Sequence, residues 1–329
     1  MRVLVIGTGS IGRRHMQTIQ ALRPGVCFDV LRERPPKSDV VERDVFFTVS
    51  SSLAEAMSKR PQLMVIANPS ALHLPLLRLA IEEGIPFYAE KPVVSSAEDL
   101  ETLKNCIAGY KVLPPNIVGC NLRFLPSLQA LKEMVERGDL GNIVHASFEA
   151  GQWLPDWRPG IDYRASYSSR KSLGGGVALD LIHELDSARW ILGELYDVQA
   201  IFAKASALEI DVEDSASFLM RSRLGASVSV HVNYVSRLPF RRYRIVGDQG
   251  TAEWDLPSRT LNVTTHEGSN AVALVPGAFD ISQTYIAAMS ELLRAIDERA
   301  VTSQGIEDGI SALELIFRSN STRLSRYGV

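Results

Sequence analysis

Three glycines near the start of this 329-residue chain stand between a predicted strand and a predicted helix. Gly7, Gly9 and Gly12 form the pattern G-x-G-x-x-G. They follow the short apolar run Val3–Ile6 and precede helical spacing over Ile11–Leu22. Such a turn presents backbone N–H groups and the positive end of a helix dipole to a pyrophosphate. The stretch therefore predicts a dinucleotide site, whose expected contacts are Gly7, Gly9, Ser10, Ile11 and Gly12.

The residues after the second predicted strand bear on which dinucleotide is bound. Val26–Leu31 is expected to pair in parallel with the first strand, and Arg32, Glu33 and Arg34 follow it. An acidic residue there binds the adenosine ribose of NAD, whereas arginine binds the 2′-phosphate of NADP. The chain offers both types. We predict NADP, with Arg32 and Arg34 as its contacts; NAD and an unliganded charged turn are the alternatives.

Two later strand ends also carry polar residues. Asn68, Pro69 and His73 follow the buried run Leu63–Ala67, and ligands sit at strand ends in open parallel sheets. A helix-capping or core role for His73 is the alternative. Glu90 and Lys91 follow Pro86–Ala89, and a lysine beside a nicotinamide can polarise a carbonyl or move its proton. A structural Glu-Lys pair is the alternative. The predicted cofactor contacts here are Asn68, Pro69, His73, Glu90 and Lys91.

A second stretch with chemical potential begins at Gly174–Gly176 and leads into a predicted helix over Val177–Leu192. In one continuous helix, Asp180 and His183 share a face with Glu184 and Ser187. The glycines would let a ligand approach closely, and an Asp and a His one turn apart can share a proton. We predict Asp180 and His183 to be catalytic, with Lys91. A solvated polar face is the alternative.

Other chemistries fit the sequence less well. His183-Glu184 begins like a zinc helix of the H-E-x-x-H type, but Ser187 occupies the position of the second histidine. We expect no catalytic metal. No G-x-S-x-G element is present, which argues against a serine nucleophile of that type.

The remaining pattern predicts two domains. Strands and helices alternate over the first part, which indicates a doubly wound parallel sheet of the Rossmann type in residues 1–124. A helix is expected over Pro126–Arg137. Residues 125–329 then predict an α+β domain with an open, mostly antiparallel sheet. Its expected strands are Ile143–Ala150, Ala216–Ser222, Ser227–Tyr234, Tyr243–Val246, Thr251–Asp255 and Leu261–Thr265. Helices over Tyr285–Glu298 and Ile306–Arg326 are expected to close the chain.

Composition is that of an ordinary globular protein, with 46% hydrophobic and 22% charged residues. A formal charge of −3 gives no reason to expect nucleic acid or a membrane surface as partner. No apolar run is long enough to span a bilayer, and the start does not read as a signal peptide. Cys27, Cys106 and Cys120 have no C-x-x-C spacing and suggest reduced thiols in a cytoplasmic protein.

Taken together, these motifs resemble those of the Gfo/Idh/MocA oxidoreductases. The shared elements, in order, are Gly7-x-Gly9-x-x-Gly12, Asn68-Pro69 with His73, Glu90-Lys91-Pro92, Asn121-x-Arg123-Phe124, and Gly174-Gly175-Gly176 leading to Asp180 and His183. The glycine pattern is common to many families. The E-K-P element followed by G-G-G…D…H is far more specific.

The resemblance implies NAD(P)-dependent oxidation or reduction of sugars, inositols or their derivatives. It implies a homo-oligomer, a dimer or tetramer, assembled through the open sheet. Lys91 would hydrogen-bond the reacting oxygen, Asp180 and His183 would place substrate and handle its proton, and Arg123 would contact substrate. Many members space the last pair as D-x-x-x-H, one residue more than here. Either the local helix differs or the two residues divide their roles differently, so the acid/base residue stays open.

The segment Trp153–Arg158, with Asp162-Tyr163-Arg164, is similar to a subgroup of enzymes that make bacterial surface sugars. Aromatic faces suit sugar rings, and Arg158 or Arg164 could bind a carboxylate or phosphate. A surface loop packed on the sheet is the alternative. We predict Trp157, Tyr163 and Arg164 to contact substrate, with Lys91, Arg123, Asp180 and His183.

The sequence therefore predicts a cytoplasmic NAD(P)-dependent oxidoreductase that acts on a sugar or sugar derivative, in surface-polysaccharide sugar synthesis or a related pathway. One alternative is a dinucleotide-binding sensor without turnover. Another is a glycosidase or lyase that uses its NAD transiently.

Overall fold

The computed structural model describes residues 1–31, 45 and 47–325, and its chain forms two compact units. Unit 1 comprises residues 1–121 and 285–310, and unit 2 comprises residues 122–284 and 311–329. The sequence had placed the boundary after residue 124 and assigned everything beyond it to the second domain. Helical periodicity shows that a segment buries one face but not which core receives it, so the return of residues 285–310 to unit 1 was not foreseen.

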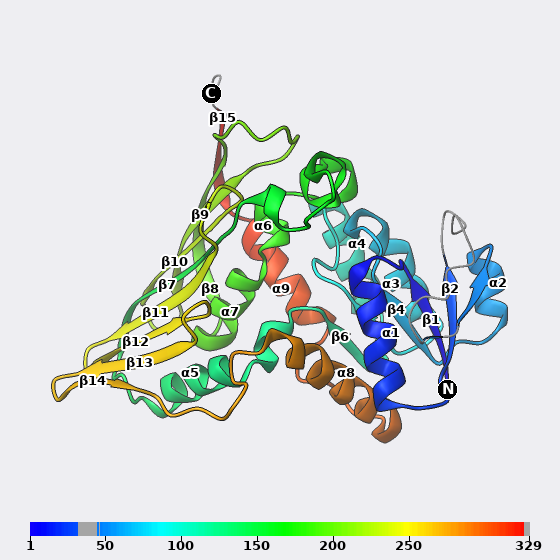
Figure 1. The fold of residues 1–329 in the computed structure, drawn as a ribbon, viewed down its shortest axis with the longest axis horizontal. Coiled ribbons are helices and arrows are strands. Elements are labelled where there is room, and N and C mark those ends of the chain that lie inside the picture. Colours follow the sequence, from blue (N-terminus) through cyan, green and yellow to red (C-terminus); the bar gives the residue numbers. More distant parts are fainter. Residues whose placement is uncertain (32–44, 46, 326–329) are drawn as a thin grey trace. The chain divides into compact units, whose positions relative to one another are not determined.

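Unit 1 contains a six-stranded sheet of order β3-β2-β1-β4-β5-β6, with every neighbouring pair parallel (Figure 1). Its strands are β1 Arg2–Ile6, β2 Cys27–Leu31, β3 Phe47–Ser50, β4 Leu63–Ile66, β5 Phe87–Ala89 and β6 Asn116–Val118. The intervening helices are α1 Ser10–Leu22, α2 Leu53–Ser58, α3 His73–Glu82 and α4 Ala97–Ala108. This confirms the predicted doubly wound parallel sheet.

The central strands of unit 1 are buried on both faces, as their continuous apolar runs predict. Val3, Leu4 and Val5 of β1 are fully buried, as is all of Leu63–Ile66. The strand order reverses between β1 and β4, so the turns after these two strands lie side by side. Ligands bind at such a switch point in open α/β sheets.

Unit 2 is built on a nine-stranded sheet of order β14-β13-β12-β11-β7-β10-β9-β8-β15. Its strands are β7 Ile143–Gly151, β8 Leu195–Lys204, β9 Ser215–Ser222, β10 Ser227–Asn233, β11 Phe240–Gly247, β12 Gly250–Asp255, β13 Thr260–Thr265, β14 Gly268–Ala271 and β15 Asn320–Ser325. Neighbours pair antiparallel except β7–β10 and β8–β15, which are parallel. The sheet is thus mixed and mostly antiparallel, as expected.

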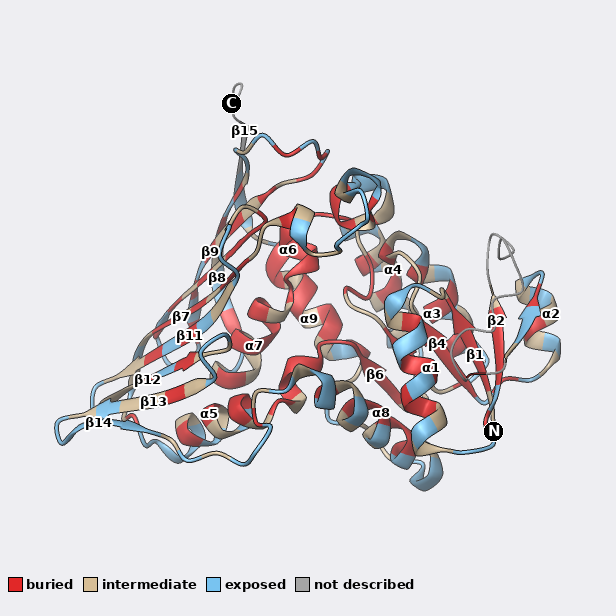
Figure 2. Ribbon diagram, viewed as in Figure 1, coloured by how far each residue is buried: buried red, intermediate tan, exposed pale blue. Residues whose placement is uncertain are grey.

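Three helices, α5 Pro126–Arg137, α6 Val177–Asp180 and α7 His183–Leu192, lie on one face of this sheet (Figure 1). Burial alternates along β9 accordingly: Phe218 and Met220 are buried, while Leu219 between them is 54% exposed. Figure 2 colours the strands of this sheet by burial. Trp254 is fully buried beneath α5, where its indole Nε1 donates to Ser127 Oγ at 2.9 Å. In the part of the chain that the structure describes, no helix covers the opposite face.

Short 3₁₀ helices and two long helices complete the described chain. The 3₁₀ helices are η1 Ser70–Leu72, η2 Asn121–Phe124, η3 Leu154–Asp156, η4 Tyr163–Ala165, η5 Tyr167–Ser169 and η6 Lys171–Leu173. The long helices are α8 Ile281–Glu298 and α9 Ile306–Phe317. Over the residues described, none of the helices has the length and apolarity that crossing a membrane requires.

The prediction of a C-terminal helix over Ile306–Arg326 was wrong for the second half of that range. Helix α9 ends at Phe317, and the chain continues as β15 along the free edge of β8. Ser319, Asn320, Ser321 and Thr322 have side chains that compete with helical hydrogen bonds. The free edge of β8 is available to pair with this segment, which therefore forms a strand. The sequence had not predicted β8, so this pairing was not expected.

Asp29 of β2 illustrates how a carboxylate is kept inside unit 1. It is 1% exposed and accepts hydrogen bonds from Lys59 Nζ at 2.9 Å, Ser50 Oγ at 2.6 Å and Thr48 Oγ1 at 2.7 Å. Burial by itself raises the pKa of Asp29, but these bonds outweigh it and hold the pKa below its ordinary value of 3.8.

We expect Asp29 to contribute stability that is complete above its ordinary pKa of 3.8 and is lost as pH falls through the lower folded value. Denaturant titrations of wild type and Asp29→Asn across the acid range measure this. The difference between their free energies of unfolding should shrink as pH falls below 3.8. A difference that stays constant with pH would contradict this role.

Candidate active site

Two glycines of the turn after β1 have no room for a side chain, and a third has room for one. Gly7 has φ +91°, and a Cβ there would lie 2.6 Å from Ala67 O. A Cβ on Gly12 would lie 2.0 Å from Gly7 O. Gly9 has an ordinary backbone conformation, and its Cβ would meet nothing within 4 Å. Open space beside Gly9, at the start of α1, is what a pyrophosphate needs.

The first turn of α1 begins directly after Gly9, so its N–H groups have no earlier helical carbonyl to bond. Ser10 is exposed and Ile11 is partly exposed at this end. The residues present therefore fit a dinucleotide phosphate, and contact by Gly7, Gly9, Ser10, Ile11 and Gly12 stays a prediction. Arg32 and Arg34, expected near the adenosine, lie outside the described residues.

The turn after β4 is braced by His73. Its Nε2 lies 2.9 Å from Asn68 O, and the side chain is 1% exposed. Burial lowers the pKa of His73, which favours the neutral ring. These contacts favour the supporting role for His73. Asn68 Oδ1 is buried without a partner among the described residues, and Pro69 precedes η1, so this turn offers an unused acceptor next to the glycine turn.

Glu90 and Lys91 follow β5 at the same end of the sheet. The Glu90 N–H donates to Ile66 O at 2.9 Å, which extends the strand pairing by one residue. The carboxylate is bound by His15 of α1, with His15 Nε2 2.8 Å from Glu90 Oε1. No sequence motif had indicated His15.

The helix expected over Val177–Leu192 is broken. Helix α6 ends at Asp180, Leu181 has φ −100° and ψ 35°, and α7 begins at His183. Asp180 and His183 therefore do not lie on one continuous helical face. The local helix differs, which was one of the two explanations for the unusual D-x-x-H spacing. The solvated-face alternative was also wrong, because Asp180 is 2% exposed and Glu184 and Ser187 are fully buried.

Two tyrosine hydroxyls hold the carboxylate of Asp180. Tyr167 Oη donates to Asp180 Oδ1, and Tyr234 Oη donates to Asp180 Oδ2 at 2.9 Å. Tyr234 is fully buried, and burial raises its pKa well above its ordinary value, so its hydroxyl stays protonated. Each Asp180 oxygen thus accepts one phenolic proton, which fixes the carboxylate plane.

Consecutive residues of the predicted sugar loop contact these two tyrosines. The Trp157 ring packs edge-on against Tyr234 at 5.2 Å, and the Arg158 guanidinium lies 5.1 Å from the Tyr167 ring centre. No carboxylate pairs with Arg158 within the described part of the chain. The loop is therefore in contact with the side chains that orient Asp180.

The other predicted substrate residues of this loop lie in a different setting. Arg164 is exposed and pairs with Asp162 at 2.9 Å and Glu209 at 3.3 Å. Tyr163 Oη accepts from the Glu209 N–H at 3.2 Å. Substrate contacts by Tyr163 and Arg164 stay predictions, because their polar groups already have protein partners.

Arg123 has a structural partner. Its Nε and Nη2 donate to the two oxygens of Asp186 at 2.9 and 2.6 Å, and both side chains are buried. A buried bidentate pair of this kind fixes η2 against α7. Substrate contact by Arg123 also stays a prediction.

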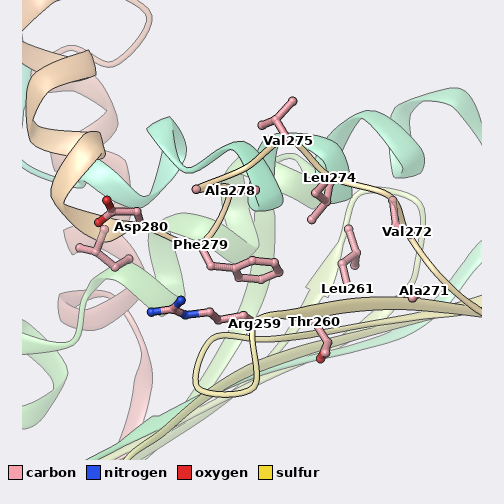
Figure 3. A pocket seen from close by; sticks show the side chains of 12 residues that line it. Arg259, Thr260, Leu261, Ala271, Val272, Leu274, Val275, Ala278, Phe279 and Asp280 are labelled. Atoms are coloured by element: carbon pink, nitrogen blue, oxygen red, sulfur yellow. The ribbon is translucent and has the colours of Figure 1, made fainter.

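A hollow of unit 2 with a volume of about 680 Å³ lies elsewhere (Figure 3). Its lining includes Leu261 of β13, Arg259 of the turn before β13, and Phe279 of the segment before α8. None of the predicted site residues lines this hollow. We therefore locate the candidate site by its residue types and not by this hollow.

Sequence reasoning missed His15, Tyr167 and Tyr234. The tyrosines stand 13 residues before and 54 residues after Asp180, and His15 is 75 residues from Glu90. No spacing rule connects residues so far apart. Only the fold brings them together.

The fold and the glycine turn define an NAD-binding oxidoreductase of the Rossmann type, and comparison with known families agrees. A family model described as an oxidoreductase family with an NAD-binding Rossmann fold matches residues 1–113, and one described as the GFO/IDH/MocA C-terminal domain matches residues 128–253. The chain belongs to the Gfo/Idh/MocA family, as its motifs predicted.

Curated relatives and solved structures agree with this assignment. Levoglucosan dehydrogenase of Pseudarthrobacter phenanthrenivorans is 25% identical, over 79% of this chain and 74% of its own length. UDP-N-acetylglucosamine 3-dehydrogenase of Acidithiobacillus ferrooxidans is 29% identical, over 85% and 82%. A levoglucosan dehydrogenase structure with NADH and levoglucosan shares the fold, with a TM-score of 0.83, 21% identity, and coverage of 96% and 95%.

We expect Gly9→Val to fold normally but to bind the dinucleotide much more weakly, because its side chain would fill the open space beside α1. Gly12→Val is the matched comparison, and it should lower the melting temperature because its Cβ would clash with Gly7 O. Calorimetry with NAD and NADP, together with thermal unfolding, measures both. Near-wild-type affinity in Gly9→Val would contradict a pyrophosphate at this turn.

Removing either Asp180 donor should cost stability, and more so at the buried one. Tyr234→Phe should lower the free energy of unfolding by about 1.5–3 kcal/mol, as for hydrogen bonds to charged groups. Tyr167→Phe should cost less, because water can reach this partly exposed position. Denaturant unfolding in wild-type and Asp180→Asn backgrounds isolates the bond. Losses that are the same in both backgrounds would show that the hydroxyls act elsewhere.

Proposed function

We propose that this protein transfers hydride between NAD(P) and a carbinol carbon of a sugar or sugar derivative. The observation that carries the proposal is the buried Asp180 carboxylate, held by two phenols beneath an aromatic and arginine-bearing loop. Curated relatives named for levoglucosan, inositol and UDP-N-acetylglucosamine support a sugar or a polyol as the substrate class.

The dinucleotide, when bound, supplies the nicotinamide ring that accepts or donates hydride. The chain's own part is to hold it: the Gly7–Gly12 turn at the pyrophosphate, Asn68 and Pro69 at the next strand end, and Lys91 near the reacting carbon. Arg32 and Arg34 favour NADP through its 2′-phosphate. Holding the two carbons in contact is most of what such a fold contributes.

Hydride transfer at a carbinol carbon must be coupled to movement of the hydroxyl proton. Asp180 already accepts one proton-bearing phenol at each oxygen, which suits it to orient the substrate rather than to take the proton. Lys91 and His183 are then the residues that hold and move it. Lys91 would hydrogen-bond the reacting oxygen, and His183 would act as acid/base.

Trp157 and Arg158 provide the substrate side of the site. Aromatic faces pack against sugar rings, and a guanidinium without a carboxylate partner can bind an anionic substituent. The sequence had offered Arg158 or Arg164 for such a group and had predicted Arg164 as the substrate contact. The ion pairs of Arg164 and the place of Arg158 above Tyr167 favour Arg158.

The helix-free face of the unit 2 sheet supports assembly into a homo-oligomer, a dimer or tetramer. Ile201 and Leu219 project from this face, 49% and 54% exposed, on the neighbouring strands β8 and β9. Exposed apolar groups gathered on one face mark interaction surfaces. We place the enzyme in the cytoplasm because its three cysteines have no C-x-x-C spacing and suggest reduced thiols. We place its product in surface-sugar synthesis on the resemblance of the loop at residues 153–164.

The decisive experiment is mass spectrometry of the co-purified cofactor, followed by a panel of sugars, inositols and nucleotide sugars monitored by nicotinamide absorbance. Stoichiometric reduction or oxidation of the cofactor with at least one of these compounds supports the proposal. Product formation with no net change in cofactor would instead indicate a glycosidase or lyase. Binding without any turnover would indicate a sensor.

Lys91→Ala and His183→Ala should each lower turnover by about 10²–10⁴-fold, the usual contribution of general acid–base catalysis, and Asp180→Ala should lower turnover because the substrate is no longer oriented. Lys91→Ala should be the most damaging. Dinucleotide affinity should hardly change, because the phosphates are held at the glycine turn. Double variants should lose less than the product of the single losses, because the groups act on one proton.

Single-turnover hydride transfer at saturating cofactor measures these losses. Gly9→Val is the comparison, since it should lose affinity while retaining the rate of the bound complex. A Lys91→Ala enzyme that keeps most of its wild-type rate would contradict the assignment.

For a substrate that carries a carboxylate or phosphate, Arg158→Gln should lower kcat/KM about tenfold to a hundredfold, the value of a charge-assisted hydrogen bond. Arg164→Gln is the matched control and should stay near wild type. Glucose, glucuronate and glucose 6-phosphate form a suitable comparison set. Equal losses in both variants would restore Arg164 as a substrate contact.

A further inference from the structure

His15 of α1 is a buried polar side chain that the proposed reaction does not yet use. It is fully buried, and its Nε2 lies 2.8 Å from Glu90 Oε1. A carboxylate only accepts, so Nε2 carries the shared proton. Nδ1 has no partner within the described part of the chain. Burying a polar side chain costs folding free energy unless the side chain is hydrogen-bonded.

Three elements of unit 1 contact Glu90. The backbone N–H of Glu90 donates to Ile66 O of β4. A Cβ on Gly119, just after β6, would lie 2.9 Å from Glu90 Oε2, so only a glycine leaves room for the carboxylate. His15 of α1 bonds the other oxygen. The Glu90 carboxylate thus lies against Gly119 and is bonded to His15, directly before Lys91 in the chain.

Aromatic rings fix the His15 imidazole in turn. The Tyr88 ring centre lies 4.3 Å from that of His15, and the Tyr285 ring centre lies 6.0 Å away. Tyr88 Oη is buried and has no hydrogen-bond partner among the described residues. Tyr88 thus contributes packing to His15 and no hydrogen bond to Glu90.

We infer that His15 is a positioning residue, which ties the dinucleotide turn to the segment that carries Lys91. His15 stands three residues after Gly12 on the helix that begins at the glycine turn, and Glu90 directly precedes Lys91. The His15–Glu90 bond fixes the distance between these two segments. The inference rests on the proposed function, because the role of Lys91 is part of that proposal.

The test compares His15→Phe, which removes the donor, with His15→Gln, which keeps one at similar reach. Tyr88→Phe is the matched control for packing around the ring. Amide hydrogen exchange of the peptide over residues 89–96 reports the segment directly and needs no substrate. Single-turnover hydride transfer at saturating cofactor, with the sugar found in the panel, reports the consequence.

In His15→Phe we expect faster exchange at residues 89–96 and a hydride-transfer rate about 10²-fold lower, the cost of a displacement of about 1 Å at a reacting group. KM for the dinucleotide should hardly change. His15→Gln should recover most of both signals, and Tyr88→Phe should match wild type. If His15→Phe fails to fold because it leaves Glu90 unpaired, the double variant His15→Phe/Glu90→Gln replaces it with the same expectations.

Several outcomes would overturn the inference. They are exchange at residues 89–96 that does not change, a His15→Gln variant no better than His15→Phe, or a loss confined to cofactor affinity. A different result would contradict the proposed function alone: the hydrogen-exchange rates change as expected, but the wild-type protein oxidises or reduces no compound of the panel.

Discussion

A carboxylate taken out of water must be given hydrogen-bond donors, and this requirement organises both units of the molecule. Asp29 takes three donors in unit 1, and Glu90 takes His15. In unit 2, Asp180 takes two phenols and Asp186 takes a bidentate arginine. Each of these bonds joins elements that are distant in sequence. The buried acids therefore hold helices, strands and loops in register, and the apolar core fills the space between them.

The same requirement explains why the candidate catalytic residues are fixed in place. Asp180 cannot rotate without breaking a bond to Tyr167 or Tyr234, and Glu90 cannot move without leaving its space beside Gly119. When catalytic side chains are already fixed in position, little conformational entropy is lost as the reacting atoms come together. Aromatic rings pack against the donors in each unit: Tyr88 against His15 in unit 1, and Trp157 against Tyr234 in unit 2.

The glycines divide into two physical roles. Gly7 and Gly12 carry no side chain because the backbone of the turn and that of β4 leave no room for one. Gly9 carries none although the fold would accept one, which is why we propose that the pyrophosphate lies beside it. The broken helix between Asp180 and His183 also has a local cause. Leu181 leaves the helical conformation with φ −100° and ψ 35°, so α6 ends at Asp180 and α7 begins at His183.

The sequence by itself determined the parallel sheet, the glycine turn, the family, and which residue types could move hydride and proton. These follow from local periodicity and from motifs within a few residues, where each residue's neighbours are known in advance. Only the tertiary structure decided that α9 gives way to β15, that residues 285–310 join unit 1, and that Asp180 is buried rather than solvated. The donors His15, Tyr167 and Tyr234 likewise emerged only there. Hydrogen bonds across tens of residues depend on which elements pack together, and no spacing in the chain encodes that choice.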